Sequence, residues 1–168
     1  MKIKISSLSD GVHNFNFDES VEELGLEEPF HGNFKVDVEL NKLHNQIILN
    51  ANLTLNANFD CDRCNKNYDD VLTSSYQMVY LSGTEPIDNG AINIIYLPFD
   101  ADKIELDNDV RDYALLAIPM KKLCKEDCKG LCSNCGKNLI EGDCGCEHNT
   151  VDPRWLPLNE LKNKLNNN

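Results

Sequence analysis

The chain has 168 residues, of which 41% are hydrophobic and 26% are charged. This length and composition predict one globular domain with a small appendage. No apolar run is long enough to cross a membrane, and residues 1–18 lack the apolar core of a secretory signal. We therefore expect a cytoplasmic protein with no membrane association. The formal net charge of −12 weakens a role as a general nucleic-acid binder, because such proteins are normally basic.

The charge is unevenly distributed along the chain. Residues 1–118 hold 8 Lys and Arg against 21 Asp and Glu, a net charge of −13, whereas residues 119–168 hold 8 against 7, a net charge of +1. An acidic body suits a basic partner, although a simply solvated acidic surface is the more common explanation. Any RNA contact by the tail must be local. The lysines available for it are Lys121, Lys122, Lys125, Lys129 and Lys137.

Alternating apolar and polar residues predict strands in the first two thirds of the chain. The expected strands cover residues 34–40, 49–59, 71–81 and 92–99, with a further edge strand at 2–5 and a turn near 43–45. Residues 18–32 and 82–90 are expected to be loops. The pattern favours an antiparallel sheet with one covered face.

The periodicity changes from two to that of a helix after Leu106. A helix is expected over about 108–118, capped by Asp107 or Asn108 and ended before Pro119. It should lie on the sheet. A short terminal helix is expected from Pro157, with an apolar stripe of Leu158, Leu161 and Leu165.

Eight cysteines fall in four close pairs, and they carry the clearest chemistry of the sequence. The pairs are Cys61 with Cys64, Cys124 with Cys128, Cys132 with Cys135, and Cys144 with Cys146. Clustered cysteines in a reducing compartment are typical of metal sites, and zinc prefers four ligands in a tetrahedron. Gly136 after Cys135 and Asn65 after Cys64 tolerate the left-handed backbone that a zinc knuckle needs. We therefore expect two bound Zn²⁺ ions.

Spacing indicates how the pairs combine. The last two pairs lie in one short segment and can close a site locally, so Cys132, Cys135, Cys144 and Cys146 are assigned to one zinc ion. The remaining residues, Cys61, Cys64, Cys124 and Cys128, form a long-range site that would stabilise the body. Exchange of pairs remains an alternative because Cys128 lies close to Cys132. His148 is a spare ligand candidate, although four sulfurs already complete the site.

The overall expectation is an α+β protein with two parts. Residues 1–123 form a mainly antiparallel β body covered by one helix. Residues 124–168 form a Cys-rich zinc-knuckle segment with a short terminal helix. A shared zinc site is expected to hold the two parts together as one unit.

Catalytic and redox functions are less favoured than a structural metal site. A closed four-cysteine zinc site lacks the open position of a catalytic zinc. A thioredoxin-like CxxC lies at a helix N-terminus, whereas a polar, turn-like run follows Cys64 and favours a hairpin instead. The sequence contains no motif of a nucleophilic hydrolase, a phosphate-binding loop or a zinc protease. We expect no catalytic residues and no small-molecule substrate.

Several sequence strings together resemble the YceD family, the large ribosomal RNA subunit accumulation proteins of bacteria and plastids. These are C-D-R-C at 61–64, I-E-L at 104–106, V-R-D at 110–112, A-I-P at 117–119, C-K-G-L-C-S-N-C-G-K-N-L at 128–139, C-G-C at 144–146 and D-P-R at 152–154. The match begins at about residue 34. Asp112 and Tyr113 depart from the family's usual glutamate-type residues. The resemblance implies a role in the synthesis, processing or stability of large-subunit ribosomal RNA, and it supplies no catalytic residues.

Three functional hypotheses follow. The first is a non-enzymatic zinc protein of ribosome biogenesis that binds a large-subunit ribosomal RNA precursor or a basic large-subunit ribosomal protein. The second is a cytosolic thiol- or metal-handling protein, a zinc reservoir or redox sensor, with a reactive Cys61 or Cys64. The third is sequence-specific RNA recognition, for which Arg154 and Trp155 are the suggestive residues. Burial of Trp155 in a core is the simpler explanation, and the nucleic-acid-binding residues are unknown.

Overall fold

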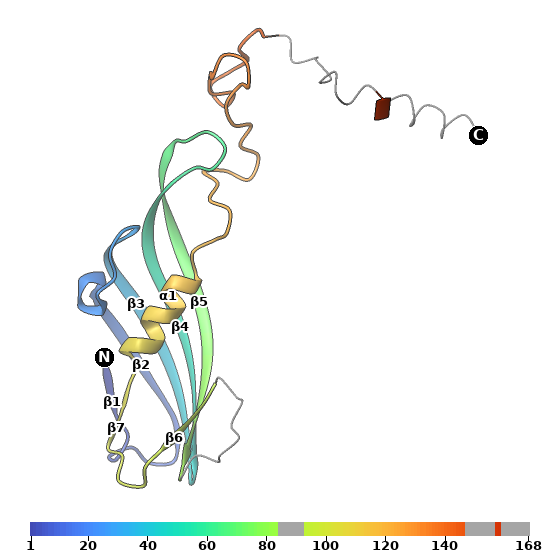
Figure 1. Ribbon diagram of the computed structural model, residues 1–168. Helices are drawn as coiled ribbons and strands as arrows, with labels where there is room; N and C mark the ends of the chain where they lie inside the picture. Colours follow the sequence, from blue (N-terminus) through green and yellow to red (C-terminus); the bar gives the residue numbers. More distant parts are fainter. Residues whose placement is uncertain (84–92, 147–156, 159–168) are drawn as a thin grey trace. The chain divides into compact units, whose positions relative to one another are not determined.

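The computed structural model describes residues 1–83, 93–146 and 157–158 (Figure 1). Contacts between residues divide the chain into two units. The first unit comprises residues 1–62 and 66–124, and the second comprises residues 63–65 and 125–168. From the sequence, the boundary between the β body and the Cys-rich segment was expected between residues 123 and 124. That a shared zinc site holds the two expected parts together stays a prediction.

Five strands form the main sheet of the first unit, in the order β2-β3-β4-β5-β6 (Figure 1). They are β2 (Gly11–Ser20), β3 (Phe30–Leu43), β4 (Gln46–Asp60), β5 (Asn67–Ser82) and β6 (Ile94–Leu97). Strands β2 to β5 are antiparallel neighbours, which confirms the expected antiparallel pattern for most of the sheet. Strand β6 runs parallel to β5, so the complete sheet is mixed.

Alternating side chains give the sheet one buried face. In β4, Leu49, Leu53 and Leu55 are at most 1% exposed, while the intervening Asn52 and Thr54 are exposed. The β3–β4 register places the buried Val36 opposite Leu53. Burial of each large aliphatic side chain contributes roughly 1.5–3 kcal/mol. The predicted row of inward residues on this strand is therefore confirmed.

Strand β2 was not predicted from the sequence, and residues 18–32 were wrongly expected to be only a loop. Strand β2 covers residues up to Ser20, a short 3-10 helix η1 (Val21–Leu24) follows, and β3 begins at Phe30. The strand lies at the edge of the sheet, so its alternating His13, Phe15 and Phe17 are only half-buried. Half-buried edge positions need not be strongly apolar, and the periodic signal is weak for that reason.

The edge strand expected at 2–5 belongs to a different sheet. Strand β1 (Lys2–Lys4) pairs with β7 (Lys103–Glu105) in a separate two-stranded antiparallel sheet. Each strand has three residues, too few for a periodic pattern to reveal β7 in the sequence. The ammonium of Lys2 pairs with the Glu105 carboxylate across the two strands, and Lys103 of β7 pairs with the same carboxylate.

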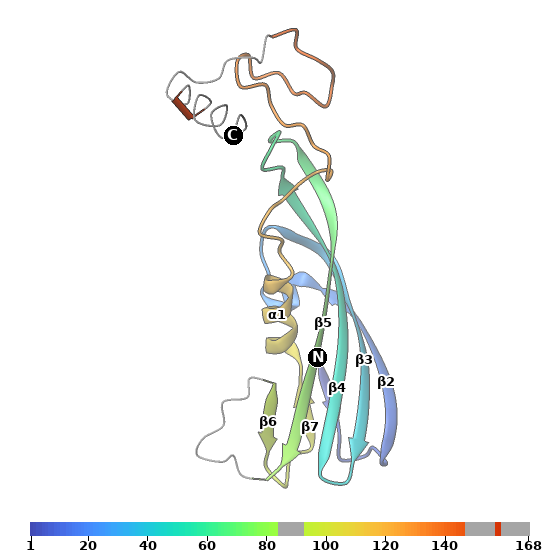
Figure 2. The same cartoon turned by 90° about the vertical axis from the view of Figure 1, so that its right-hand side faces the viewer.

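Helix α1 (Asp107–Leu116) covers the buried face of the sheet, as expected from the sequence (Figure 2). Val110 and Ala114 are fully buried, and the ring of Tyr113 stacks on Tyr76 of β5 with centroids 4.2 Å apart. The predicted side-chain cap is wrong. The N-cap residue is Leu106, which makes no side-chain cap, and Asp107 instead pairs with the amino group of Met1.

The second unit is built mainly from turns in its described part. An isolated β-bridge joins Leu131 and Asn138. Pro157 and Leu158 are helical, and the remainder of the expected terminal helix, with Leu161 and Leu165, lies outside the described residues. No helix among the described residues has both the length and the apolar character needed to cross a membrane.

Candidate metal centres

The β4–β5 hairpin positions the first pair of cysteines. Cys61 directly follows β4, and its backbone N–H donates to the carbonyl of Lys66 at 2.9 Å, which closes the turn. Asn65 has a φ of 54°, so the left-handed residue expected after Cys64 is present. The turn connects two antiparallel strands, unlike the strand-to-helix turn of a thioredoxin-like site.

The segment after α1 reaches the same hairpin. The backbone N–H of Asp62 donates to the carbonyl of Lys122 at 2.8 Å, and the backbone N–H of Lys122 donates to the Asp62 carboxylate at 2.7 Å. The Lys122 ammonium also lies 5.4 Å from the centroid of the Phe59 ring, a cation–π distance. These contacts hold the chain two residues before Cys124.

Arg63 organises the loop that carries Cys128. Its guanidinium donates to the carbonyl of Cys128 at 2.7 Å, and its own carbonyl accepts from the N–H of Leu131 at 3.2 Å. Gly130 has a φ of 78°, and a Cβ there would lie 2.9 Å from the Arg63 carbonyl oxygen. The arginine between the two cysteines therefore bonds to backbone carbonyls of this loop, and Gly130 permits the close approach.

The first cysteine group comprises Cys61, Cys64, Cys124 and Cys128, whose sulfur atoms lie within 4.8 Å of one another. A tetrahedral zinc site with Zn–S bonds of about 2.3 Å has sulfurs roughly 3.8 Å apart, so the grouping fits such a site. Cys61, Cys64 and Cys128 are at most 5% exposed. A metal ion bound by this group would have little access to solvent.

The second cysteine group comprises Cys132, Cys135, Cys144 and Cys146, whose sulfur atoms also lie within 4.8 Å of one another. A hydrogen bond of the same kind closes the CxxC turn in this group: the backbone N–H of Cys132 donates to the carbonyl of Lys137 at 2.8 Å. Gly136 has a φ of 74°, as expected. Cys135 is exposed, and Cys144 and Cys146 are half-buried, so this group is more accessible than the first.

Hydrogen bonds within the second cysteine group shift the pKa values of two of its thiols in opposite directions. The backbone N–H of Cys135, followed by smaller contributions including Asn134, lowers the pKa of Cys132 to about 6. Hydrogen bonds to the thiols of Cys135 and Cys144 raise the pKa of Cys146 to about 12. The thiolate is the form of cysteine that binds metal ions, so the lowered pKa of Cys132 suits a role as a ligand.

The structure brings the eight cysteines together as two groups of four, and the assignment of each group to one metal ion remains a prediction. Four thiol sulfurs form a donor set that suits zinc. Either group can hold a metal ion, and the identity of that metal remains a prediction. His148, Arg154 and Trp155 lie outside the described residues.

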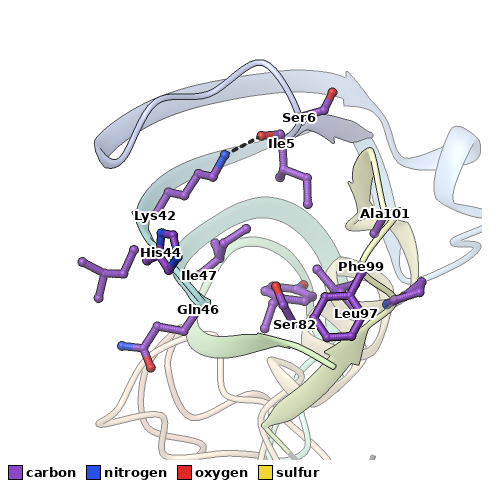
Figure 3. A pocket seen from close by; sticks show the side chains of 13 residues that line it. Ile5, Ser6, Lys42, His44, Gln46, Ile47, Ser82, Leu97, Phe99 and Ala101 are labelled. Carbon is purple, nitrogen blue, oxygen red and sulfur yellow. Dashed lines mark hydrogen bonds between the residues drawn. The ribbon is translucent and has the colours of Figure 1, made fainter. Parts of the chain in front are cut away.

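A separate hollow lies at the end of the main sheet near the β3–β4 turn (Figure 3). Lys42, His44 and Ser82 line it. The Lys42 ammonium donates to the carbonyls of Ile5 at 3.0 Å and Leu8 at 2.6 Å, so it fixes the segment after β1. With a volume of about 140 Å³, the hollow is smaller than typical small-molecule sites of about 300–1,000 Å³.

The family model described as large ribosomal RNA subunit accumulation protein YceD matches residues 49–162. The matched stretch covers more than half of the chain and contains all eight cysteines. It begins in β4 and includes β5 and α1. The chain belongs to the YceD family.

Curated relatives share shorter segments with the chain. The chloroplastic YCED homolog 1 of Arabidopsis thaliana, named a large ribosomal RNA subunit accumulation protein, is 30% identical over 71 residues, 42% of this chain and 22% of that protein. Uncharacterised proteins of Mycobacterium tuberculosis and Mycobacterium leprae are 38% and 33% identical over 58 residues, 34% of this chain and 28% and 26% of those proteins. These matches span about a quarter of each relative. No solved structure matches the chain.

Proposed function

We propose that this chain is a non-enzymatic zinc protein of the cytoplasm that supports the accumulation of large-subunit ribosomal RNA. The observation that carries the proposal is the family match across residues 49–162, which includes both cysteine groups. The family description and the name of the Arabidopsis relative both refer to accumulation of this RNA. Closed four-sulfur sites favour a structural use of the metal.

The charge distribution supports a basic partner. Residues 1–118 carry a net charge of −13, and a zinc ion held by four thiolates would leave each cysteine group negative, whereas four neutral thiols carry no charge. A basic large-subunit ribosomal protein, or an assembly particle that contains one, is therefore the partner we propose. Direct RNA contact would depend on local cations of the second unit, such as Lys125 and Lys129, which are exposed.

A native pull-down of the full chain from growing cells, performed with and without ribonuclease, tests this proposal. We expect large-subunit RNA precursors or large-subunit proteins among the captured molecules. A basic ribosomal protein that survives ribonuclease identifies a protein partner, whereas loss of all partners on ribonuclease treatment identifies association through RNA. If the zinc-loaded chain captures neither large-subunit RNA nor large-subunit proteins, the proposed function is contradicted.

A thiol- or metal-handling function is the second candidate, because the second cysteine group is accessible to solvent. Cys61 and Cys64, the reactive cysteines expected under this hypothesis, are 2% and 5% exposed, which opposes reactivity at that pair. Alkylation of the native zinc-loaded chain distinguishes the two functions. Rapid alkylation with zinc release favours metal handling, and inert thiols favour the structural use.

A further inference from the structure

The sequence around η1 is acidic without interruption. Between Lys4 and Lys35 the chain contains seven Asp and Glu residues and no Lys or Arg. Four of these carboxylates lie within or just after η1, and all four are exposed. They are Glu22, Glu23, Glu27 and Glu28. In the described part of the chain, no salt bridge involves any of the four.

A hollow of about 370 Å³ lies between the segment after η1 and the C-terminal half of α1. We call it the η1–α1 groove. Its lining includes Leu26, Glu27, Glu28, Arg111, Leu115 and Ile118. Leu26 is buried, with 5% exposure, whereas Leu115 is 48% exposed. The groove thus combines an apolar surface with two carboxylates and one guanidinium.

Apolar exposure continues along the chain beyond the groove. Leu116 is 75% exposed, and Met120 is fully exposed. Within the groove lining, the half-exposed Leu115 offers an apolar side chain that gains free energy when a partner covers it. Glu27 and Glu28 outnumber the single guanidinium of Arg111 in the lining, and this excess of negative charge favours a cationic partner, because opposite charges steer the encounter.

We propose that the η1–α1 groove binds a lysine- and arginine-rich protein segment that inserts an apolar side chain beside Leu115 and Ile118. Cationic side chains flanking this anchor would pair with Glu27 and Glu28. The Arg111 guanidinium would donate to a backbone carbonyl or a carboxylate of the same segment. The proposal rests on the proposed function, since it locates the surface by which the body would hold a basic large-subunit protein.

Site-specific photo-crosslinking of the full chain tests the location. The probe is the total protein extracted from purified large ribosomal subunits, treated with ribonuclease. p-Benzoylphenylalanine replaces Leu115 in one variant and Val71 in a matched control. Val71 is 58% exposed and lies next to the inward-facing Leu72 on β5, so it belongs to the opposite face of the sheet from α1. We expect a crosslink to a basic protein from position 115 and none from position 71.

Charge reversal tests the chemistry. The double variant Glu27→Lys with Glu28→Lys should retain about tenfold less of the crosslinked protein, the effect expected for two exposed ion pairs turned into repulsions. Asp10→Lys with Glu39→Lys makes the same change in net charge at exposed carboxylates outside the groove lining and should retain as much as the wild type. Raised salt should weaken retention.

Each remaining outcome contradicts a defined part of the account. Crosslinks only from position 71, or equal loss in both double variants, would overturn the groove while leaving the proposed function intact. A crosslinked dimer of the chain through position 115 would assign the groove to a second copy and also overturn the inference. Failure of the wild type to retain any large-subunit protein would contradict both the groove and the protein partner.

Discussion

Gly130 shows how a single residue permits the first cysteine group to form. Its left-handed φ of 78° alone costs other residues roughly 1–2 kcal/mol, and its closeness to the Arg63 carbonyl leaves no room for a side chain. Arg63 then joins two segments of the second unit through bonds to Cys128 and Leu131. Both residues shape the loop without contributing a sulfur ligand.

Gly130→Ala should therefore weaken metal binding by the first cysteine group, because the new Cβ forces the Cys128 loop away from Arg63. Metal content and thermal unfolding of the purified variant measure the effect. Gly25→Ala is the matched control, since Gly25 has a φ of 64° but no atom within 4 Å of the added Cβ. The control should lose stability through backbone strain while it keeps its metal. Equal metal loss in both variants would contradict the role assigned to Gly130.

At the scale of the elements, helix α1 contains a carboxylate that is partly buried against β5. Asp109 lies 3.5 Å from the Tyr80 hydroxyl. Burial raises the pKa of Asp109 from its ordinary value, an effect that the Tyr80 contact partly offsets and the nearby Asp112 reinforces. An acid with a raised pKa in the folded state contributes most to stability below its unfolded pKa, and that contribution is lost as pH rises through the folded pKa.

Asp109→Asn should for this reason increase the melting temperature at pH 7, where the wild-type carboxylate is charged. The advantage should shrink as pH falls towards 4, because the wild-type carboxyl becomes neutral. Thermal unfolding of both proteins between pH 4 and pH 7 measures the difference. A constant or inverted difference across this range would show that burial does not disfavour the Asp109 charge.

The elements also show which parts of the fold the sequence predicted. Central strands β3, β4 and β5 were predicted because their inward rows are almost wholly apolar. Strand β2 was missed because its alternating residues are half-buried and polar residues flank them. Spacing alone suggested the two cysteine groups, and their use as metal sites stays a prediction. The hydrogen bonds between Asp62 and Lys122 could not be predicted, because no local pattern in the sequence relates residues that are 60 positions apart.

At the scale of the whole molecule, the two cysteine groups differ in accessibility. The first is largely buried, whereas Cys135 of the second is exposed. An excess of chelator should remove metal in two phases, with one ion lost quickly from the second group. The fast phase should be absent in the variant Cys135→Ser. In the wild type, the circular dichroism signal of the sheet should persist once the fast phase is complete. Release of both ions in one phase would contradict two sites of different exposure.

The central claim is that one chain carries two separate four-cysteine zinc sites, and native mass spectrometry of the full chain tests it most directly. We expect a mass that corresponds to two zinc ions per chain. Cys61→Ser and Cys132→Ser should each retain one ion, and only Cys61→Ser should also destabilise the body. A wild-type chain with fewer than two ions, or the loss of both ions from either variant, would contradict the claim.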